Sequence, residues 1–200
     1  MTRSSGSAPV ARVSHAERRA AKAEIDDPGV VLEAALRFLE ARARSEAEVR
    51  RRLIWAGYRP ELVESAVARM RDLGILDDAV FARAWIESRD RARPRGERAL
   101  REELRLRGVD GAVITEALEE RRAVAVEAVE DLESEAAPPS ADEAAAERVI
   151  ARNARALARV VDPRARRQRA YALLARNGFD PGVCATVAAR VVERSDDEPD

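Results

Sequence analysis

The sequence predicts an all-α fold, and both its composition and the spacing of its apolar residues indicate this. The chain of 200 residues is 46% hydrophobic and 36% charged but only 4% aromatic. Alanine, leucine, arginine and glutamate dominate, and all four are strong helix formers, whereas the β-branched and aromatic clusters typical of strands are missing. Apolar residues recur three and four positions apart, which puts them on one face of a helix. We therefore expect short helices packed through alanine, leucine and valine.

The first two predicted helices follow each other closely. Apolar residues at helical spacing predict a helix over residues 31–43. Ser45 starts the second helix, since its hydroxyl can cap the first-turn N–H groups and Glu48 can complete a capping box. Gly57 is a suitable residue to end that helix.

A third helix completes the unit, and a second unit follows. Pro60 suits a first helical turn, and the apolar spacing carries this helix to Gly74. The second unit starts at Asp77 and stops at Gly108. The apolar face that opens it consists of Val80, Phe81, Ala84, Trp85 and Ile86.

Three glycines, Gly57, Gly108 and Gly178, indicate an internal repeat. A leucine lies four residues before each, a large apolar residue directly after, and another apolar residue five positions after. These positions are Leu53, Leu104 and Leu174; Tyr58, Val109 and Phe179; Leu62, Val113 and Val183. Hydrophobic capping of helix ends could produce part of this pattern, but the shared downstream positions favour a true repeat.

The predicted organisation is three three-helix repeats with a linker and two tails. Pro138 and Pro139 interrupt an acidic stretch, which indicates a linker before a weaker third copy. The predicted segments are a disordered tail at 1–28, repeats at 29–76 and 77–121, an acidic linker at 122–142, a third repeat at 143–194, and a disordered acidic tail at 195–200.

No constellation typical of catalysis, a cofactor or a metal is found in the sequence. His15 is the only histidine and lies in the predicted tail. Cys184, the only cysteine, falls on an apolar helix face, where packing is favoured over nucleophilic chemistry. Asp77 and Asp78 could suggest acid–base chemistry, but helix capping explains them more simply. We expect a protein that is not an enzyme.

Cysteine content and hydropathy also predict the compartment. A single cysteine excludes an intrachain disulfide, and no apolar stretch is long enough to act as a signal peptide or to span a bilayer. We expect a cytoplasmic protein without membrane contact.

Charge is distributed unevenly along the chain. Residues 37–107 carry a net charge of +5, residues 108–148 a net charge of −9, and residues 149–200 a net charge of +3. A polyanionic partner for the basic parts is therefore plausible despite the total of −1.

An arginine series in the second unit is the strongest candidate binding surface. Local pairs, such as Arg98 with Glu102 or Arg101 with Glu97, would make it an ordinary solvated face. Alternatively, the turn around Gly96 could bring several guanidinium groups onto one concave surface that contacts phosphates or acidic side chains. The candidate binding residues are Arg89, Arg91, Arg93, Arg95, Arg98, Arg101 and Arg105, with Arg50 and Arg51 as an extension. Trp85 and Tyr58 could stack on bases, but their spacing favours the core.

Two ordered sets of residues are more specific than any single motif. The set in the second unit is Leu76-Asp77-Asp78, Phe81-Ala82, Ser88-Arg89, Gly96, Glu103-Leu104 and Gly108-Val109. The set in the first unit is Ala35-Leu36, Phe38-Leu39, Arg44-Ser45-Glu46, Glu48-Val49, Leu53 and Gly57-Tyr58. With these residues the sequence resembles the RecX family of regulators of the RecA recombinase, most strongly over residues 31–121 and more loosely in the third unit. The acidic linker looks longer than the usual join in this family.

The resemblance implies both a fold and a function. The implied fold is three tandem three-helix repeats in an elongated, curved array. The implied partner is RecA on single-stranded DNA, whose ATP hydrolysis, coprotease action and strand exchange such proteins modulate, usually as inhibitors, in DNA repair, recombination and the SOS response. Some members also bind DNA directly, and we expect a monomer.

Two functions therefore stay open. The leading hypothesis is a RecA-binding regulator without enzymatic activity. The alternative is a helical DNA-binding protein that acts alone through its arginine-rich surface.

Overall fold

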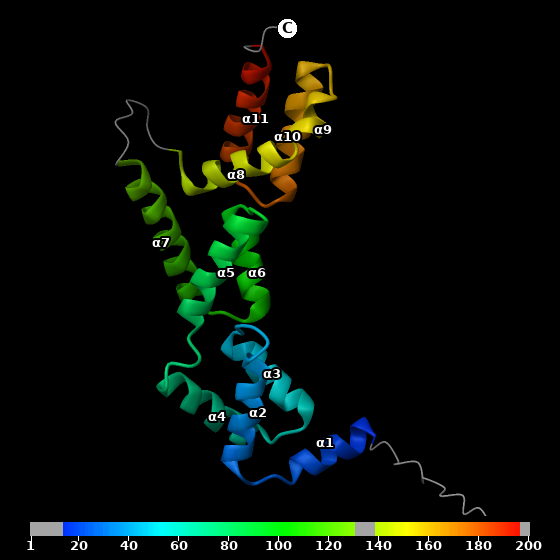
Figure 1. The fold of residues 1–200 in the computed structure, drawn as a ribbon, viewed down its shortest axis with the longest axis vertical. Helices are drawn as coiled ribbons and strands as arrows, with labels where there is room; N and C mark the ends of the chain where they lie inside the picture. Colours follow the sequence, from blue (N-terminus) through cyan, green and yellow to red (C-terminus); the bar gives the residue numbers. More distant parts are fainter. Residues whose placement is uncertain (1–13, 131–138, 197–200) are drawn as a thin grey trace, which may run out of the picture. The chain divides into compact units, whose positions relative to one another are not determined.

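The computed structural model describes residues 14–130 and 139–196, and every regular element within these ranges is an α-helix. The predicted all-α class is confirmed. The chain divides into unit 1, residues 1–76, and unit 2, residues 77–200. The helices of unit 1 are α1 (His15–Ala23), α2 (Pro28–Leu39), α3 (Glu46–Ala56) and α4 (Pro60–Asp72). Those of unit 2 are α5 (Asp78–Ala92), α6 (Glu97–Arg107), α7 (Gly111–Glu130), α8 (Ala141–Arg152), α9 (Ala154–Ala158), α10 (Pro163–Arg176) and α11 (Pro181–Asp196) (Figure 1). None of these helices is both long and apolar enough to cross a membrane.

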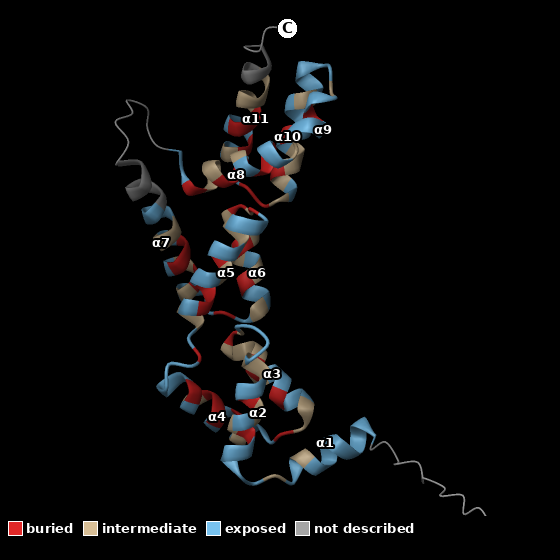
Figure 2. Cartoon of the chain, in the orientation of Figure 1, coloured by how far each residue is buried: buried red, intermediate tan, exposed pale blue. Residues whose placement is uncertain are grey.

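Helices α2, α3 and α4 pack around the core of unit 1. Buried residues of these helices (Figure 2) form one hydrophobic cluster. Ser45 and Glu48 form the predicted capping box, and Gly57 ends α3 with a φ of 108°. Helix α2 ends at Leu39, four residues before the predicted end. The core consists of Val31, Ala35, Val49, Leu53, Tyr58, Val63, Ala66, Val67, Met70 and Leu76.

Helix α1 corrects the prediction of a disordered tail over residues 1–28. Ser14 and Glu17 form a capping box that starts this helix, and Asp27 caps α2, which begins within the predicted tail at Pro28. The backbone of α1 lies against Gly57, where a Cβ atom would sit only 2.6 Å from the Arg19 carbonyl oxygen. No residue of α1 is buried (Figure 2). Residues 1–13 lie outside the described part of the chain.

Helices α5, α6 and α7 enclose the second core, and α7 corrects the predicted linker over residues 122–142. No proline or glycine follows Gly111 in this helix, so it continues to Glu130. At the other end of the predicted linker, Ala141 already belongs to α8. Residues 131–138, with Pro138, lie outside the described part. The core consists of Phe81, Ala82, Ile86, Leu100, Leu104, Val109, Ile114, Ala117 and Leu118.

Helices α8 to α11 form the third core, with the short α9 as an element that the sequence pattern did not predict. Cys184 is fully buried, and its Sγ atom lies 3.6 Å from the Phe179 carbonyl oxygen. Burial raises the pKa of the Cys184 thiol, which disfavours the reactive thiolate. Cys184 therefore packs, as predicted. Its core neighbours are Ala145, Ala146, Val149, Ile150, Leu157, Ala170, Leu174, Phe179, Val187 and Ala188.

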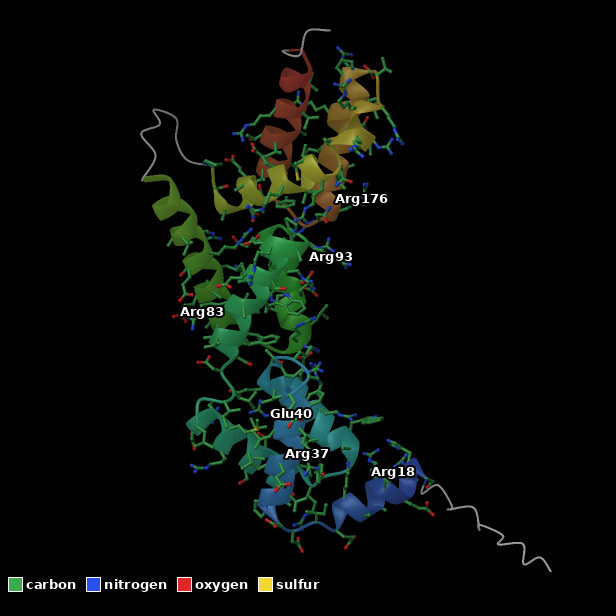
Figure 3. All side chains as sticks on the ribbon, viewed as in Figure 1. Arg18, Arg37, Glu40, Arg83, Arg93 and Arg176 are labelled. Atoms are coloured by element: carbon green, nitrogen blue, oxygen red, sulfur yellow. The ribbon has the colours of Figure 1, made fainter. Side chains whose placement is uncertain are left out.

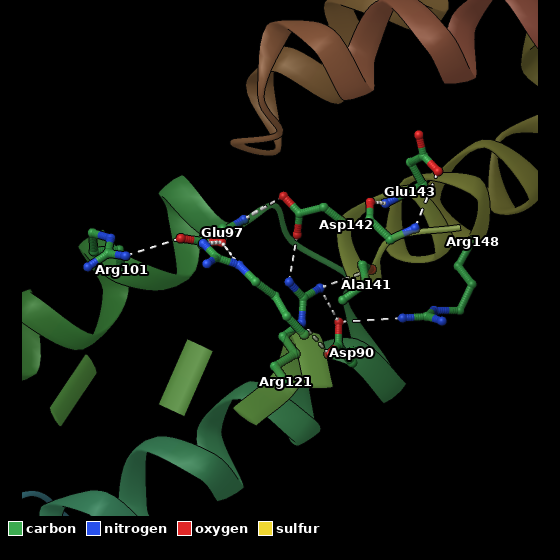
Figure 4. Close-up of polar contacts among 10 residues, drawn as sticks. Asp90, Glu97, Arg101, Arg121, Ala141, Asp142, Glu143 and Arg148 are labelled. Atoms are coloured by element: carbon green, nitrogen blue, oxygen red, sulfur yellow. Dashed lines mark hydrogen bonds and ion pairs between the residues drawn. The ribbon is translucent and has the colours of Figure 1, made fainter. Parts of the chain in front are cut away.

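Within unit 2, a nearly buried arginine fastens α7 to α5 and α8. The Arg121 side chain is only 8% exposed, and its guanidinium lies 2.8 Å from a carboxylate oxygen of Asp90 and 2.6 Å from one of Asp142 (Figure 4). The second Asp142 oxygen accepts the backbone N–H of Glu97 at 3.1 Å, so it also caps α6. Burial disfavours the charged guanidinium, but the hydrogen bonds that it donates to Asp90 and Asp142 outweigh this effect and raise the pKa of Arg121.

Contacts of Arg95 and Gly96 form a joint between the start of α6 and the turn after α10. The Gly96 N–H donates to the Asn177 carbonyl at 3.1 Å, and the Arg95 guanidinium donates to the Asn177 side-chain oxygen at 2.7 Å. A Cβ atom on Gly96 would overlap the backbone of Gly178, so only glycine permits this approach. Arg152 donates to the last carbonyls of α5, those of Arg91 at 2.8 Å and Ala92 at 2.6 Å.

Replacing Arg121 should destabilise unit 2 markedly. In Arg121→Met, Asp90 and Asp142 would face each other without the cation that pairs them. We expect the free energy of unfolding, measured by urea denaturation, to fall by about 2–4 kcal/mol, because removing one partner of a buried ion pair strands the other charges.

The matched control is Arg83→Met, which breaks the exposed pair between Arg83 and Glu120. Exposed pairs contribute about 1 kcal/mol or less, so this control should change stability little. Equal losses in the two variants would contradict the role given to Arg121.

Glu97 should contribute stability that depends on pH. Burial raises the pKa of its carboxyl, but hydrogen bonds from Arg122 and Arg101 outweigh this and hold the pKa below the usual value. A lowered folded-state pKa means that the contribution is complete above the unfolded pKa, about 4.3, and is lost as the pH falls through the folded value. Denaturation of wild type and Glu97→Gln should therefore show a stability difference that is constant near neutrality and shrinks below about pH 4.3. A difference that grows on acidification would refute this assignment.

Candidate functional site

Several arginines of the predicted binding surface instead form ion pairs within unit 2. Arg89 lies 2.6 Å from a carboxylate oxygen of Glu103, and Arg95 approaches the same carboxylate at 3.7 Å. Arg101 pairs with Glu97 at 3.1 Å, as the local-pair alternative predicted, and also donates to the Thr115 hydroxyl at 3.0 Å. These guanidinium groups hold helices together, so they are not available to a partner.

Trp85 organises the same internal cluster. Its indole N–H donates to Glu103 at 2.9 Å, and the guanidinium carbons of Arg89 and Arg107 lie 4.2 and 3.5 Å from its ring centroid. Its ring also stacks beside Phe81 at a centroid distance of 6.1 Å. Trp85 therefore packs between α5 and α6, as its spacing predicted. Tyr58 is buried in the core of unit 1, again as predicted.

The two candidates on α3 belong to unit 1. Arg50 lies between two carboxylates, 3.1 Å from Glu46 and 2.9 Å from Glu64. Arg51 is exposed on the same helix. Arg50 thus ties α3 to α4.

Four arginines of the series remain exposed on unit 2. Arg91 is 78% exposed and lies 3.7 Å from Glu87, an exposed pair of small energetic value. Arg93 and Arg105 are exposed and make no ion pair with any described residue. Arg98 makes no pair with Glu102 in the described structure; its guanidinium instead approaches the Ala175 carbonyl of α10 at 3.5 Å.

Helices α9 and α10 carry basic residues that were not among the sequence-predicted candidates. Residues 154–176 hold seven arginines and one acidic residue, Asp162. The Asp162 carboxylate accepts backbone N–H groups at the start of α10, so it caps the helix instead of pairing with an arginine. The arginines that are exposed and without an ion pair among the described residues are Arg155, Arg159, Arg164, Arg167, Arg169 and Arg176. The net charge of residues 149–200 did not reveal this basic cluster, because acidic residues near the C-terminus offset the arginines in the sum.

Exposed arginines lie near the contact between α6 and α10, including Arg93 directly after α5. Arg98 reaches Ala175, the neighbour of Arg176. Arg169 and Arg176 are seven residues apart on α10, which puts them on one helix face. Figure 3 shows Arg93 and Arg176 extending from the same side of unit 2. We name these four residues, Arg93, Arg98, Arg169 and Arg176, the α6–α10 arginine surface.

This surface has the chemistry of an anion-binding site. A guanidinium group presents planar N–H donors that fit phosphate or carboxylate oxygens. No described carboxylate neutralises the four arginines, so their positive charge can attract a polyanion. The described residues include no group of histidine, cysteine, aspartate and glutamate side chains that could hold a metal ion.

Comparison with protein families and with known proteins gives a consistent assignment. The model of the first RecX three-helix domain matches residues 32–70, and that of the second matches residues 77–118. Regulatory protein RecX from Mycobacterium sp. strain KMS is 43% identical over 83 residues, which cover 42% of this chain and 45% of that protein. The chain thus spans about half the length of this relative.

A longer match comes from Streptomyces. Regulatory protein RecX of Streptomyces coelicolor is 30% identical over 163 residues, covering 82% of this chain and 78% of that protein. The crystal structure of RecX from Lactobacillus salivarius superposes with a TM-score of 0.62 at 18% identity, over 83% of this chain and 97% of that one. The crystal structure shares the helical fold, and the sequence matches show that this chain belongs to the RecX family of regulatory proteins.

Proposed function

We propose that this protein binds RecA and its filament on single-stranded DNA, and that it lowers the ATPase, coprotease and strand-exchange activities of RecA without itself being an enzyme. The observation that carries the proposal is the α6–α10 arginine surface, whose guanidinium groups have no described carboxylate partner. In this proposal α2–α4, α5–α7 and α8–α11 are three repeats of one binding module in a cytoplasmic monomer.

A nucleoprotein filament fits this surface chemically. It presents phosphates and acidic side chains, and guanidinium groups bind both through charge-assisted hydrogen bonds. Rigid positioning also favours such binding, because Arg121, Asp142 and the Gly96 contact hold α6 against the α10 turn. Two helices far apart in sequence can therefore present their arginines together without a large ordering cost on binding.

Neutralising the surface should weaken the effect on RecA. We expect wild type to lower ATP hydrolysis by RecA assembled on single-stranded DNA. A variant with Arg93, Arg98, Arg169 and Arg176 changed to alanine should need about tenfold more protein for the same effect, because four charge-assisted contacts are lost. Arg95 is left in place because it holds Asn177.

The control changes four other arginines, Arg42, Arg69, Arg71 and Arg83, to alanine, and removes the same charge. It should keep nearly the wild-type effect, with thermal unfolding used to check that both variants are folded. Equal weakening in the two variants would show that net charge matters and not this surface.

The alternative function is DNA binding without RecA. It draws support from the same observation, since uncompensated arginines also attract bare phosphates. If wild type leaves RecA hydrolysis unchanged while it binds naked DNA in a salt-dependent manner, the alternative replaces the proposal.

A further inference from the structure

Unit 1 contains a groove that the proposed function does not use. It lies between α1, α2 and α3 and has a volume of about 240 Å³. Three of its side chains are cations and two are aromatic, and no carboxylate lines it. The lining residues are Lys22, Ala34, Arg37, Phe38, Arg52, Leu53, Ala56 and Tyr58.

The cations of this groove keep most of their charge available. The Lys22 ammonium lies 5.0 Å from the centroid of the Tyr58 ring, and the Arg52 guanidinium lies 5.7 Å from that of Phe38. Neither cation makes an ion pair with a described residue. Arg37 pairs with Glu33 at 2.9 Å, but both side chains are about 70% exposed, so water and ions screen this pair.

Helix α1 completes the groove. It supplies Lys22, and it is held by the close approach of the Arg19 backbone to Gly57. The His15 ring lies 4.8 Å from that of Trp55, which gives a second contact between α1 and α3. The basic side of α1 is therefore placed beside the aromatic residues of unit 1.

An exposed tryptophan extends this aromatic surface. Trp55 is 55% exposed, although a large aromatic side chain is normally well buried. The Arg52 guanidinium lies 5.2 Å from the centroid of its ring and thus connects Trp55 with the groove. An exposed aromatic ring beside several cations is typical of surfaces that bind unpaired bases.

We propose that this groove binds one base of a single-stranded nucleic acid, while Lys22, Arg37 and Arg52 contact the adjacent phosphates. The base packs against the partly exposed Phe38, whose ring also has the Arg44 guanidinium 4.4 Å from its centroid, and a neighbouring base stacks on the exposed Trp55. The volume is smaller than the roughly 300–1,000 Å³ of pockets that enclose a whole small ligand, which fits one ring of a longer chain. The groove combines cations with aromatic rings, and no carboxylate lines it. A nucleic acid would use both the cations and the rings, whereas an acidic peptide would use only the cations.

Fluorescence of Trp55 tests this site locally. The full chain carrying Trp85→Phe has Trp55 as its only tryptophan. Titration with oligodeoxythymidylate of about 15 nucleotides should quench this fluorescence. An oligonucleotide of equal length without bases keeps the phosphates but cannot stack, so it should bind at least about fivefold more weakly and quench little. RecA is absent, so the result does not depend on the proposed regulation.

Substitutions in the same background locate the site. Lys22→Gln with Arg52→Gln should weaken binding measured by Trp55 quenching at least about tenfold, because two phosphate contacts are lost. Arg69→Gln with Arg71→Gln is the matched control on α4, and it should leave binding nearly unchanged. Circular dichroism confirms that α1 and the rest of the fold persist in each variant.

Three outcomes would overturn the assignment: equal weakening by the two double variants, equal binding of the oligonucleotide without bases, or competition by polyglutamate as strong as by oligodeoxythymidylate. The last outcome would identify an acidic protein segment as the ligand. Failure of this test would leave the RecA experiment unaffected, because that experiment changes arginines of unit 2.

Discussion

Close approach of backbones at helix-ending glycines is the constraint on which much of the structure depends. Gly57 and Gly178 both have positive φ angles, 108° and 82°, and each accepts a neighbouring helix against its bare Cα atom. At Gly57 the neighbour is the backbone of Arg19 in α1, and at Gly178 it is Ala99 near the start of α6. A side chain at either glycine would be strained and would also push the neighbour away. At these two positions the repeated glycine thus ends a helix and also provides the site where an element from earlier in the chain docks.

Ion pairing within unit 2 determines which arginine side chains stay exposed to other molecules. A buried guanidinium must be paired, because an unpaired buried charge is strongly destabilising. Arg89, Arg101 and Arg121 meet this requirement with carboxylates, so they stabilise the unit and have little left for another molecule. Arg98 and Arg176 lie at the same joint but on its outer side. Internally paired arginines and solvent-exposed arginines therefore lie only a few residues apart along α6.

The sequence predicted the helices well and the fate of the arginines poorly. Helix starts and ends depend on local chemistry, such as the Ser45 capping box and the conformation of Gly57, and both could be predicted from neighbouring residues. An ion pair such as Arg89 with Glu103 joins residues 14 positions apart, and Arg95 meets Asn177 across 82 positions. Such contacts depend on how helices pack, and no local pattern reports that.

Two predictions, the disordered N-terminal tail and the acidic linker, were each wrong over part of their length for related reasons. The first 28 residues looked irregular because they mix serine, glycine, proline and charged residues without sustained periodicity, yet a capping box starts α1 and its backbone lies against Gly57. Residues 122–130 looked like a linker because they are followed by acidic residues and prolines, yet nothing within them interrupts a helix. In both cases overall composition was a weaker guide than the chemistry of individual positions.

Helix α1 also has a thermodynamic consequence. It contributes no buried residue, so its docked state is held by few apolar contacts and should open more readily than the core helices. A ligand that contacts Lys22 and the rest of unit 1 together can bind only molecules in which α1 is docked. By linkage, such a ligand shifts the equilibrium of α1 toward the docked state. Helix α1 would then dock and undock reversibly, and its protection from amide hydrogen exchange would report the fraction of molecules whose groove holds the proposed nucleic acid.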